Sequence, residues 1–489
     1  MSAQDAIGAL ADPDSFQSWD SRVDADPGDS SEYVGDLRSA RTRSGCDESV
    51  LTCRIAIRGV DTAAIAWEFA FLGGSVGVGT AARIVTAIRR ATAEGLPLVA
   101  LPRSGGTRMQ EGAPAFVQMV AITGALAEHR AAGLPYLVHL GGPTTGGVLA
   151  TLGSAGDLTT AEPGAMIGFL GPRAFRAITG EPFPAGIQTA ENLRARGIVD
   201  AVVDWPELAD RFGTLLRLWS ERPRPIAADE ADPLPREVVA GAPTSAEELW
   251  QYVAASRAHD RIDAGQFISA HLTDVIPLPG TGQGEPGRGA LVVLGRLHGM
   301  AVMAVATEDR YTGEPLTAAG LRTIRRGIDL AERWGLPVVT IVDTLGAQLS
   351  VEGEQSGIAG EISRVMLRLV EARTATAALL LGAGTGGAAL ALLATDRIVA
   401  GSHTWVSPLA PEGAAAIRHG GTHDPAEIAW EQRIGAHALA ELGFIDVVVR
   451  ESDPDWVATA AGEVVAQLAE VVAGVDPGRR VERFSAWHS

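Results

Sequence analysis

The 489-residue sequence contains no lysine, because all 40 residues counted as lysine or arginine are arginine. Without a lysine ε-amine, the chain cannot form a Schiff base, hold pyridoxal phosphate, carry a covalent biotin or supply the lysine of a Walker A phosphate loop. Any cofactor that is attached through lysine must therefore arrive on a partner chain.

Cysteine is almost as scarce, since only Cys46 and Cys53 are present. Two cysteines exclude a disulfide framework and a four-cysteine zinc ribbon, so we expect two reduced thiols in a cytoplasmic protein. The ten histidines form no Ser-His-Asp order, Cys-His pair or metal-ligand cluster, and no metal is expected. We interpret His139, which lies in an apolar run, as a buried structural residue.

Positive charge is also in deficit, because 59 acidic residues against 40 basic ones give a net charge of −19. This balance argues against nucleic acid or an anionic membrane as partner. The N-terminus Met1–Asp5 lacks the basic flank and apolar core of a signal peptide. The uncharged run Thr374–Thr395 could span a membrane, but its centre is rich in glycine, which predicts a buried strand, loop and helix instead.

What the sequence does contain is a repeat at an offset of about 240 residues. The matched landmarks are Gly95–Val99 with Gly335–Val339, Thr145–Gly147 with Thr385–Gly387, Asp157 with Asp396, Pro172 with Pro411, and Gly197–Val203 with Gly443–Val449. A period this long exceeds the roughly 20–50 residues of solenoid repeats, so it predicts two copies of one domain.

Composition predicts the domain boundaries. We expect an N-terminal extension at 1–45, a first copy at 46–220, a linker at 221–246, a second copy at 247–475 and a polar tail at 476–489. Strands are predicted at Ile55–Ile57, Ile65–Trp67, Leu96–Leu101, Tyr136–Leu140, Val338–Val342 and Ala377–Leu381, and helices at 79–94, 114–131, 317–334 and 358–372. This alternation predicts α/β domains built from stacked βαβ units.

The two Gly-Gly steps of the repeat are the candidate chemistry. Gly146 and Gly147 follow an apolar strand and open an alanine-rich helix, and Gly386, Gly387 and Ala388 repeat the arrangement. The first N–H groups of a helix have no intrahelical partner, and two of them aimed at one point form an oxyanion hole. The alternative is that these glycines only allow the helix to pack closely on the strand. The acids Asp157, Glu162, Asp396 and Glu412 near these motifs are interpreted as capping or salt-bridge residues.

Longer motifs resemble a known family. In the first copy, Phe71–Gly77, Ser104–Gly112, Gly146–Gly147 and Ala161–Arg173 resemble the β subunit of bacterial acetyl-CoA carboxylase carboxyltransferase. In the second copy, Ile341–Ala347, Gly386–Ala388 and Ser407–Ala414 resemble the α subunit. A single chain with β first and α second resembles the actinobacterial acyl-CoA carboxylase β subunits, over about residues 45–460.

The resemblance implies two tandem crotonase-like (ClpP/crotonase ββα-spiral) domains. It implies that Gly146 and Gly147 hold the carbonyl of a CoA thioester, and that Gly387 and Ala388 hold the ureido oxygen of biotin. The implied substrate-binding residues are Gly73, Gly74, Ser104, Gly105, Gly106, Thr107, Arg108, Gly171, Pro172, Arg173, Gly346, Gly386 and Leu390. Arg108 is expected to bind CoA phosphates, with a structural ion pair as the alternative.

The implied function is the carboxyltransferase step of a biotin-dependent acyl-CoA carboxylase. CO2 would move from carboxybiotin, carried by a biotin carboxylase or biotin carrier subunit, to the α-carbon of acetyl-CoA or another short acyl-CoA, giving malonyl-CoA. The resemblance further implies a homo-oligomer, a ring of three dimers, with sites between unlike domains of different subunits. The family's usual residues are replaced by Leu345, Ala347 and Thr385 in the biotin half. A biotin-independent decarboxylase of malonyl-type thioesters and a non-catalytic assembly subunit therefore stay as alternatives.

Overall fold

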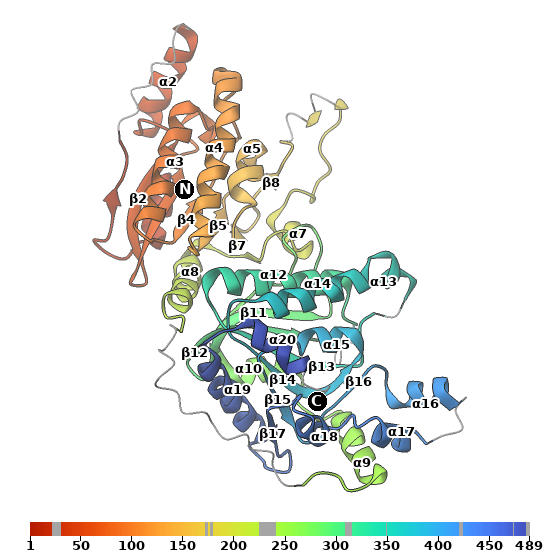
Figure 1. Cartoon of the computed structure of the whole chain (residues 1–489). Coiled ribbons are helices and arrows are strands. Elements are labelled where there is room, and N and C mark those ends of the chain that lie inside the picture. Colours follow the sequence, from red (N-terminus) through yellow and green to blue (C-terminus); the bar gives the residue numbers. More distant parts are fainter. Residues whose placement is uncertain are drawn as a thin grey trace. The chain divides into compact units, whose positions relative to one another are not determined.

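The computed structural model describes residues 1–21, 31–171, 175–176, 179–223, 241–308, 315–348, 350–419, 424–472 and 474–485. The chain forms two compact units, which are described separately (Figure 1). Unit 1 comprises Met1–Ser220 with Gly282–Glu285, and unit 2 comprises Glu221–Thr281 with Pro286–Ser489.

Unit 1 is built on a seven-stranded sheet in the order β1-β2-β3-β4-β5-β7-β9. Its strands are β1 (Gln17–Ser18), β2 (Val50–Ile57), β3 (Val60–Trp67), β4 (Leu98–Leu101), β5 (Tyr136–Leu140), β7 (Leu158–Ala161) and β9 (Ala201–Val202). β2 and β3 form an antiparallel hairpin, whereas β3, β4 and β5 are parallel. Parallel neighbours need long crossovers, which α3 (Val78–Ala93) and α4 (Gly112–Ala131) provide.

The remaining elements of unit 1 complete the domain. They are α1 (Ala3–Leu10), α2 (Ser31–Ser44), η1 (Leu72–Gly74), η2 (Met109–Glu111), β6 (Thr144–Thr145), α5 (Gly146–Val148), η3 (Leu149–Gly153), β8 (Ile167–Gly168), α7 (Ala190–Ala195) and α8 (Trp205–Ser220). The segment before residue 46, expected to be an extension, is part of the unit, because α1 packs on α8 and β3 while β1 pairs with β2.

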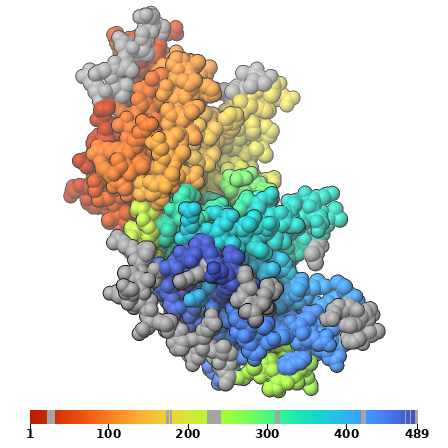
Figure 2. Space-filling model, viewed as in Figure 1, coloured from red at the N-terminus to blue at the C-terminus, as the bar shows by residue number. Residues whose placement is uncertain are grey.

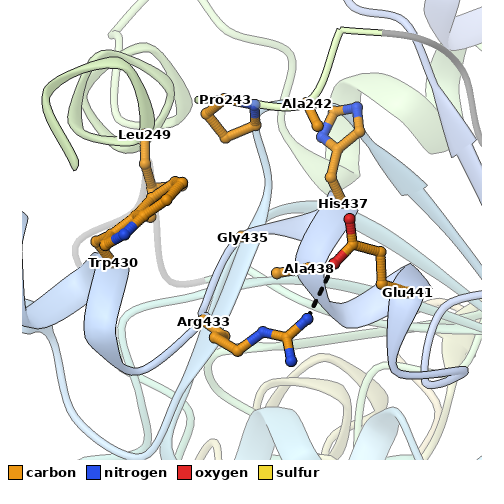
Figure 3. Close-up of a pocket in the computed structure, with 9 residues that line it drawn as sticks. All are labelled: Ala242, Pro243, Leu249, Trp430, Arg433, Gly435, His437, Ala438 and Glu441. Carbon is orange, nitrogen blue, oxygen red and sulfur yellow. Dashed lines mark hydrogen bonds and ion pairs between the residues drawn. The ribbon is translucent and has the colours of Figure 1, made fainter. Parts of the chain in front are cut away.

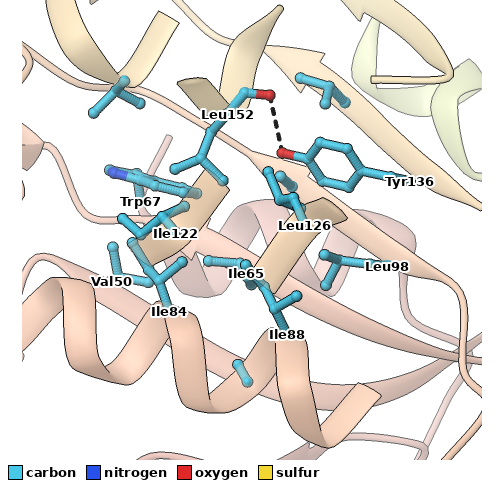
Figure 4. Packing of buried hydrophobic residues seen from close by; sticks show 14 of the residues in the cluster. Val50, Ile65, Trp67, Ile84, Ile88, Leu98, Ile122, Leu126, Tyr136 and Leu152 are labelled. Atoms are coloured by element: carbon cyan, nitrogen blue, oxygen red, sulfur yellow. Dashed lines mark hydrogen bonds between the residues drawn. The ribbon is translucent and has the colours of Figure 1, made fainter. Parts of the chain in front are cut away.

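The core of unit 1 lies between the sheet and the helices α3 and α4 (Figure 4). Ile84 and Ile88 recur on one stripe of α3 and are fully buried, as is Ile122 of α4. The helix that the sequence predicted at 79–94 is confirmed, and Ile88 and Ala91 of its expected stripe are buried, but Ala82, expected on the same stripe, is exposed. The Tyr136 hydroxyl donates to the Leu152 carbonyl at 3.0 Å, so the one polar atom of that ring is satisfied inside the core.

Unit 2 repeats the plan with an eight-stranded sheet, in which β16 pairs with β14 beside the main order β10-β11-β12-β13-β14-β15-β17. The strands are β10 (Leu272–Pro277), β11 (Ala290–Leu297), β12 (Met300–Thr307), β13 (Val338–Thr344), β14 (Thr376–Thr385), β15 (Arg397–Gly401), β16 (Trp405–Ser407) and β17 (Val447–Val449). The helices are α9 (Ala246–Ser256), α10 (Ala264–His271), α12 (Ala318–Trp334), α13 (Val351–Gln355), α14 (Ile358–Glu371), α15 (Gly386–Leu392), α16 (Pro411–His419), α17 (Pro425–Glu431), α18 (Ala436–Glu441), α19 (Trp456–Val472) and α20 (Pro477–Ser485).

The uncharged run Thr374–Thr395 contains the buried strand β14 and the helix α15. The strand and helix expected there are thus confirmed. Within the described part of the chain, we find no helix that combines the length and hydrophobicity a bilayer crossing needs.

The landmarks of the sequence repeat occupy equivalent structural positions. Asp157 Oδ2 accepts the backbone N–H of Tyr136 at 3.0 Å, and Asp396 Oδ2 accepts that of Thr376 at 2.9 Å. Each carboxylate thus ties the loop before one strand to the first residue of its neighbour. The acids are structural, as the sequence predicted.

One expected segment differs. The polar tail predicted at 476–489 contains the helix α20, which packs on α14. Arg480 of α20 is 1% exposed and binds Asp396 through two hydrogen bonds of 2.8 Å. An arginine in a polar stretch suggested solvent exposure, but the buried Asp396 provides the opposite charge that allows its burial.

Candidate active site

In unit 1, the end of β4 leads into a turn, Ser104–Thr107, which we name the unit 1 turn. The Ser104 hydroxyl donates to the Gly74 carbonyl at 2.6 Å and accepts the N–H of Gly106 at 3.0 Å. The Gly105 N–H donates to the Gly73 carbonyl at 2.9 Å. The expected residues Gly73, Gly74 and Ser104 therefore shape the turn from behind.

The unit 1 turn lies against the Gly146–Gly147 step. Gly106 and Gly146 both have positive φ, of +109° and +60°. A Cβ on Gly106 would lie 3.6 Å from Gly146 Cα and 3.7 Å from Gly147 N. Two backbones approach this closely only where side chains are absent, so the structure brings together two motifs that lie 40 positions apart in the sequence.

The two glycines of the step differ in their surroundings. The Gly146 N–H donates to the Phe169 carbonyl at 3.0 Å, so that donor is committed within the unit. Gly147 lies in the first turn of α5, where backbone N–H groups have no intrahelical partner. A Cβ on Gly147 would lie 3.0 Å from Thr107 Oγ1, so the space above this residue is bounded by the unit 1 turn.

Unit 2 contains the same arrangement at Thr344–Ala347, which we name the unit 2 turn. The Gly346 N–H donates to Thr344 Oγ1 at 3.0 Å, as Gly106 does to Ser104. A Cβ on Gly346 would lie 3.8 Å from the Thr385 carbonyl oxygen. Each unit thus presents a glycine turn beside a Gly-Gly step.

The helix that follows the second step contributes the remaining predicted residues of unit 2. Gly386 has a φ of +77° and begins α15, and Gly387 and the buried Ala388 follow it in the first turn of that helix. Leu390 is 46% exposed and Leu345 of the unit 2 turn is 65% exposed. Both side chains are thus accessible within unit 2, whereas Thr385 is buried.

In each unit, a carboxylate links the segment before the glycine turn to the segment before the Gly-Gly step. In unit 1, Glu162 accepts from Arg103 at 2.6 Å and from the Gly142 N–H at 3.4 Å. Burial alone would raise the pKa of Glu162, but the charge of Arg103 holds it below its usual value. In unit 2, Asp343 accepts the Ala383 N–H directly at 2.9 Å. Glu162 is thus a salt-bridge residue, as the sequence predicted. The sequence did not show that Arg103 and Asp343, which hold equivalent places just before the two turns, would make these contacts.

The other acids and His139 have structural partners. Glu412 binds Arg257 at 2.5 Å, as expected for a salt-bridge residue. His139 Nδ1 lies 2.9 Å from Thr160 Oγ1, and its ring packs edge-on against Trp205. Burial lowers the pKa of His139 to about 4. The imidazole is therefore neutral near pH 7, and its interpretation as a buried structural residue is confirmed.

Arg108 does not occupy a position suited to CoA phosphates. Its side chain is 1% exposed and binds the carboxylates of Glu48 and Glu111. All three nitrogens of its guanidinium donate within the unit, to Glu48, Glu111 and Ser75, so the structural ion pair takes the place of the expected phosphate contact. Gly171 is described, whereas Pro172 and Arg173 lie outside the described residues.

Three other kinds of potential site are less suited to catalysis: a cysteine nucleophile, a metal centre and a surface hollow. Burial raises the pKa of the Cys53 thiol to about 12, which disfavours the nucleophilic thiolate. In the described ranges, no three His, Cys, Asp or Glu side chains are grouped so that they could hold a metal ion. A hollow of about 310 Å³ in unit 2 lies between α9, α17 and α18, lined by Leu249, Trp430, His437 and the Arg433–Glu441 ion pair (Figure 3). Its described lining includes none of the predicted site residues.

Comparison with known proteins gives the family. The family model described as "Carboxyl transferase domain" matches residues 4–433. A probable biotin-dependent acyl-coenzyme A carboxylase beta3 subunit of Mycobacterium bovis is 46% identical over 445 residues, which cover 91% of this chain and 88% of the relative. The acetyl-coenzyme A carboxylase carboxyl transferase subunits beta/alpha of Salinispora arenicola are 34% identical over 469 residues, covering 93% of this chain and 83% of that protein.

Among solved structures, transcarboxylase 12S, a hexamer assembly with methylmalonyl-coenzyme A and methylmalonic acid bound, matches with a TM-score of 0.76. The match covers 96% of this chain and 89% of the other at 20% identity. That likeness concerns the fold, and it confirms the expected pair of crotonase-like domains. Since the domain match spans most of the sequence and the two relatives above 30% identity are covered to 88% and 83% of their lengths, the chain belongs to the carboxyl transferase family.

Proposed function

We propose that this carboxyltransferase is the component of a biotin-dependent acyl-CoA carboxylase that transfers CO2 from carboxybiotin to the α-carbon of a short acyl-CoA. The observation that carries this proposal is the duplicated backbone pocket, a glycine turn beside a Gly-Gly step in each unit. The names of the Mycobacterium and Salinispora relatives support biotin and a CoA thioester as the two ligands.

Unit 1 is the proposed thioester half. The Gly147 N–H in the first turn of α5 would donate to the thioester oxygen as it gains enolate charge, while the unit 1 turn, whose Gly105 and Gly106 N–H groups are bonded within the unit, would bound the space around that oxygen. Thr107 and Met119 bound the space next to Gly147 and would limit the access of water. The described site shows backbone donors rather than a side-chain base, which fits chemistry in which the protein stabilises the enolate and the co-substrate takes the α-proton.

Unit 2 is the proposed biotin half. Gly346 and Gly386 have positive φ and keep the region beside Thr385 free of side chains. A planar ureido group carries one carbonyl oxygen, so a pocket of backbone donors fits it. Gly387 and Ala388 would hold that oxygen, and biotin on its carrier would deliver CO2 and accept the proton. Leu390, apolar and partly exposed, would favour acetyl-CoA at least as much as propionyl-CoA.

A second copy of the chain is the proposed partner within the assembly. Phe116, Val117 and Val120 of α4 are 64%, 56% and 75% exposed, and Met109 just before the helix is 90% exposed. α4 lies on the visible face of unit 1 in Figure 2. An apolar group of this kind on a protein surface is typical of an interface. We propose that each thioester half faces a biotin half of another subunit, in a hexamer like that of transcarboxylase 12S.

The test is turnover with defined substrates. The purified protein would be incubated with malonyl-CoA and either free biotin or a biotinylated carrier, and CO2 release and carboxybiotin formation would be followed. We expect biotin-dependent turnover. CO2 release without biotin would support a decarboxylase instead, and no turnover from an intact oligomer would support an assembly subunit.

A further inference from the structure

A buried ionic cluster lies directly behind the unit 1 turn. Its centre is Arg108, the residue that follows the turn, and we name it with Tyr33, Glu48 and Glu111 the Arg108 cluster. The guanidinium binds both oxygens of Glu48, one of them at 3.2 Å, and Glu111 Oε1 at 3.1 Å. The Tyr33 hydroxyl lies 3.3 Å from Arg108 Nη1 and donates to Glu111 Oε1 at 2.5 Å.

Arg108 is bonded to the segment beside the turn through both its backbone and its side chain. The Arg108 N–H donates to the Val76 carbonyl, and the Val76 N–H donates to the Gly106 carbonyl, both at 2.9 Å. The Arg108 guanidinium also donates to the Ser75 carbonyl at 3.0 Å. Glu111 uses its second oxygen to accept the Val78 N–H at 2.6 Å. The turn, the segment 75–78 and the start of α3 are therefore fixed to one another.

The position of this turn decides the geometry beside Gly147. A methyl group added to Gly146 would meet Gly106 Cα first, at 3.5 Å, and one added to Gly147 would meet the Thr107 hydroxyl first, at 3.0 Å. Gly77 leaves the space that the cluster needs, because a Cβ there would come within 2.7 Å of Arg108 Nη1. Displacements of about 1 Å at a reacting centre can cost on the order of 100-fold in rate.

The second copy supplies an internal comparison. The bridge between Leu316 and Ala347 repeats the bridge between Val76 and Thr107, and Gln348 N donates to Leu316 O at 3.0 Å, as Arg108 N does to Val76 O. Gln348 thus stands where Arg108 stands, so the same backbone turn forms in unit 2 with an uncharged residue at this position. A buried ion pair is weak evidence for stability, because desolvation offsets much of its attraction. The cluster therefore requires another reason in unit 1.

We propose that Arg108 is a positioning residue, which together with Glu48, Glu111 and Tyr33 holds the unit 1 turn against the Gly146–Gly147 step so that the Gly147 N–H stays aimed at the thioester oxygen. This role rests on the proposed function of unit 1. It also accounts for an arginine that is buried near the site without facing the ligand.

The test compares two arginines that are buried in the same unit. Arg108→Gln gives unit 1 the residue that unit 2 carries. The matched control is Arg83→Gln, because Arg83 is 5% exposed and binds Asp47 at 2.7 Å and the Val50 carbonyl at 2.9 Å, and in the described structure its hydrogen bonds do not include residues 104–107. Amide hydrogen exchange of the ligand-free protein would be followed by mass spectrometry over residues 104–111 and 144–150, and kcat and KM for the acyl-CoA would be measured in parallel.

We expect Arg108→Gln to accelerate exchange in both segments and to lower kcat by about 10- to 100-fold with little change in KM. Arg83→Gln should leave both segments and kcat unchanged, even if it lowers the melting temperature as much. Arg108→Lys should restore part of kcat, since it keeps the charge but not the fork of donors. Equal exchange and equal kcat in the two glutamine variants would overturn the proposal. A raised KM of Arg108→Gln at constant kcat would also overturn it, because it would indicate that Arg108 binds the acyl-CoA directly.

Two further outcomes are separable. If Arg108→Gln does not fold, Tyr33→Phe removes one hydroxyl from the cluster and keeps its charges, and it should show the same changes to a smaller degree. Unchanged exchange at 104–111 in that variant would also contradict the proposal. A wild-type protein without turnover would refute the proposed function, whereas the exchange comparison would still decide whether the Arg108 cluster holds the turn.

Discussion

At the scale of single residues, the two Gly-Gly steps differ in how much space they leave. A Cβ on Gly147 would lie 3.0 Å from Thr107 Oγ1, whereas one on Gly387 would first meet Ile362 Cγ2 at 3.4 Å. Neither residue has a positive φ, so a substitution tests space rather than backbone strain. The pair therefore offers two comparable probes, one in each unit.

We predict that Gly147→Val obstructs the thioester oxygen and lowers carboxyl transfer by at least the roughly 10²–10³-fold typical of losing one oxyanion donor. Gly387→Val should block biotin-dependent turnover to a similar degree and yet leave acyl-CoA binding intact, because it lies in the other unit. Calorimetry with acyl-CoA would follow circular dichroism and sizing of both variants. Loss of CoA binding in Gly387→Val but not in Gly147→Val would mean that the two halves are assigned the wrong way round.

His139 gives a prediction for pH. Burial lowers its pKa from 6.5 to about 4 in the folded protein, so between these pH values the unfolded chain binds the proton and the folded one does not. Its contribution is present above pH 6.5 and is lost as the pH falls, by on the order of 3 kcal/mol in the free energy of unfolding. Urea unfolding at several pH values should show a shallower acid limb for His139→Gln than for the wild type. Parallel curves for the two proteins would contradict this assignment.

At the scale of elements, α20 is held to unit 2 by a buried arginine. Arg480 binds Asp396, and its guanidinium also donates to the carbonyls of Ala372 and Thr374, at 3.0 and 3.3 Å. Those carbonyls follow the end of α14, where a positive charge is favourable. The helix therefore connects α14 with the loop that carries a landmark of the repeat.

We predict that Arg480→Met lowers the free energy of unfolding by about 3–5 kcal/mol, because it leaves Asp396 buried without its counter-charge. The matched control is Arg433→Met, which breaks the exposed 2.9 Å pair with Glu441 and should cost no more than about 1 kcal/mol. Chemical denaturation monitored by tryptophan fluorescence would compare them. Similar losses in both variants would show that burial of the Arg480 pair is not what matters.

At the scale of the whole molecule, the proposed function assigns one kind of half-site to each unit, so it predicts that a complete site requires a fixed pairing of unlike halves. The apolar side chains exposed along α4 provide a surface that a second subunit could cover.

We predict that the protein is at least a dimer in solution, and a hexamer under conditions of full activity. Light scattering should give a multiple of the 50.8 kDa chain mass. Val120→Asp, which places a charge on the exposed face of α4, should shift the distribution of oligomers toward smaller species and reduce carboxyl transfer. The subunit itself should remain folded. A stable 50.8 kDa monomer with full activity would exclude the split-site arrangement.

The sequence by itself determined the duplication, the α/β class and the main strands and helices, because each depends on patterns within short segments. Apolar spacing along residues 79–94 follows from the burial of one face of α3, and the Gly-Gly steps follow from backbone conformations that other residues resist. Short motifs such as Ser104–Gly112 also sufficed to indicate the family.

Only the tertiary structure decided what each polar side chain contacts. Arg108 looked like a phosphate ligand beside a glycine motif, yet Glu48, 60 positions earlier, and Tyr33, 75 positions earlier, meet it in the core. Arg480 looked like part of a polar tail, yet it is buried and bonded to Asp396. Neither pairing leaves a local pattern, because the energy of a buried charge depends on partners that only folding brings within reach.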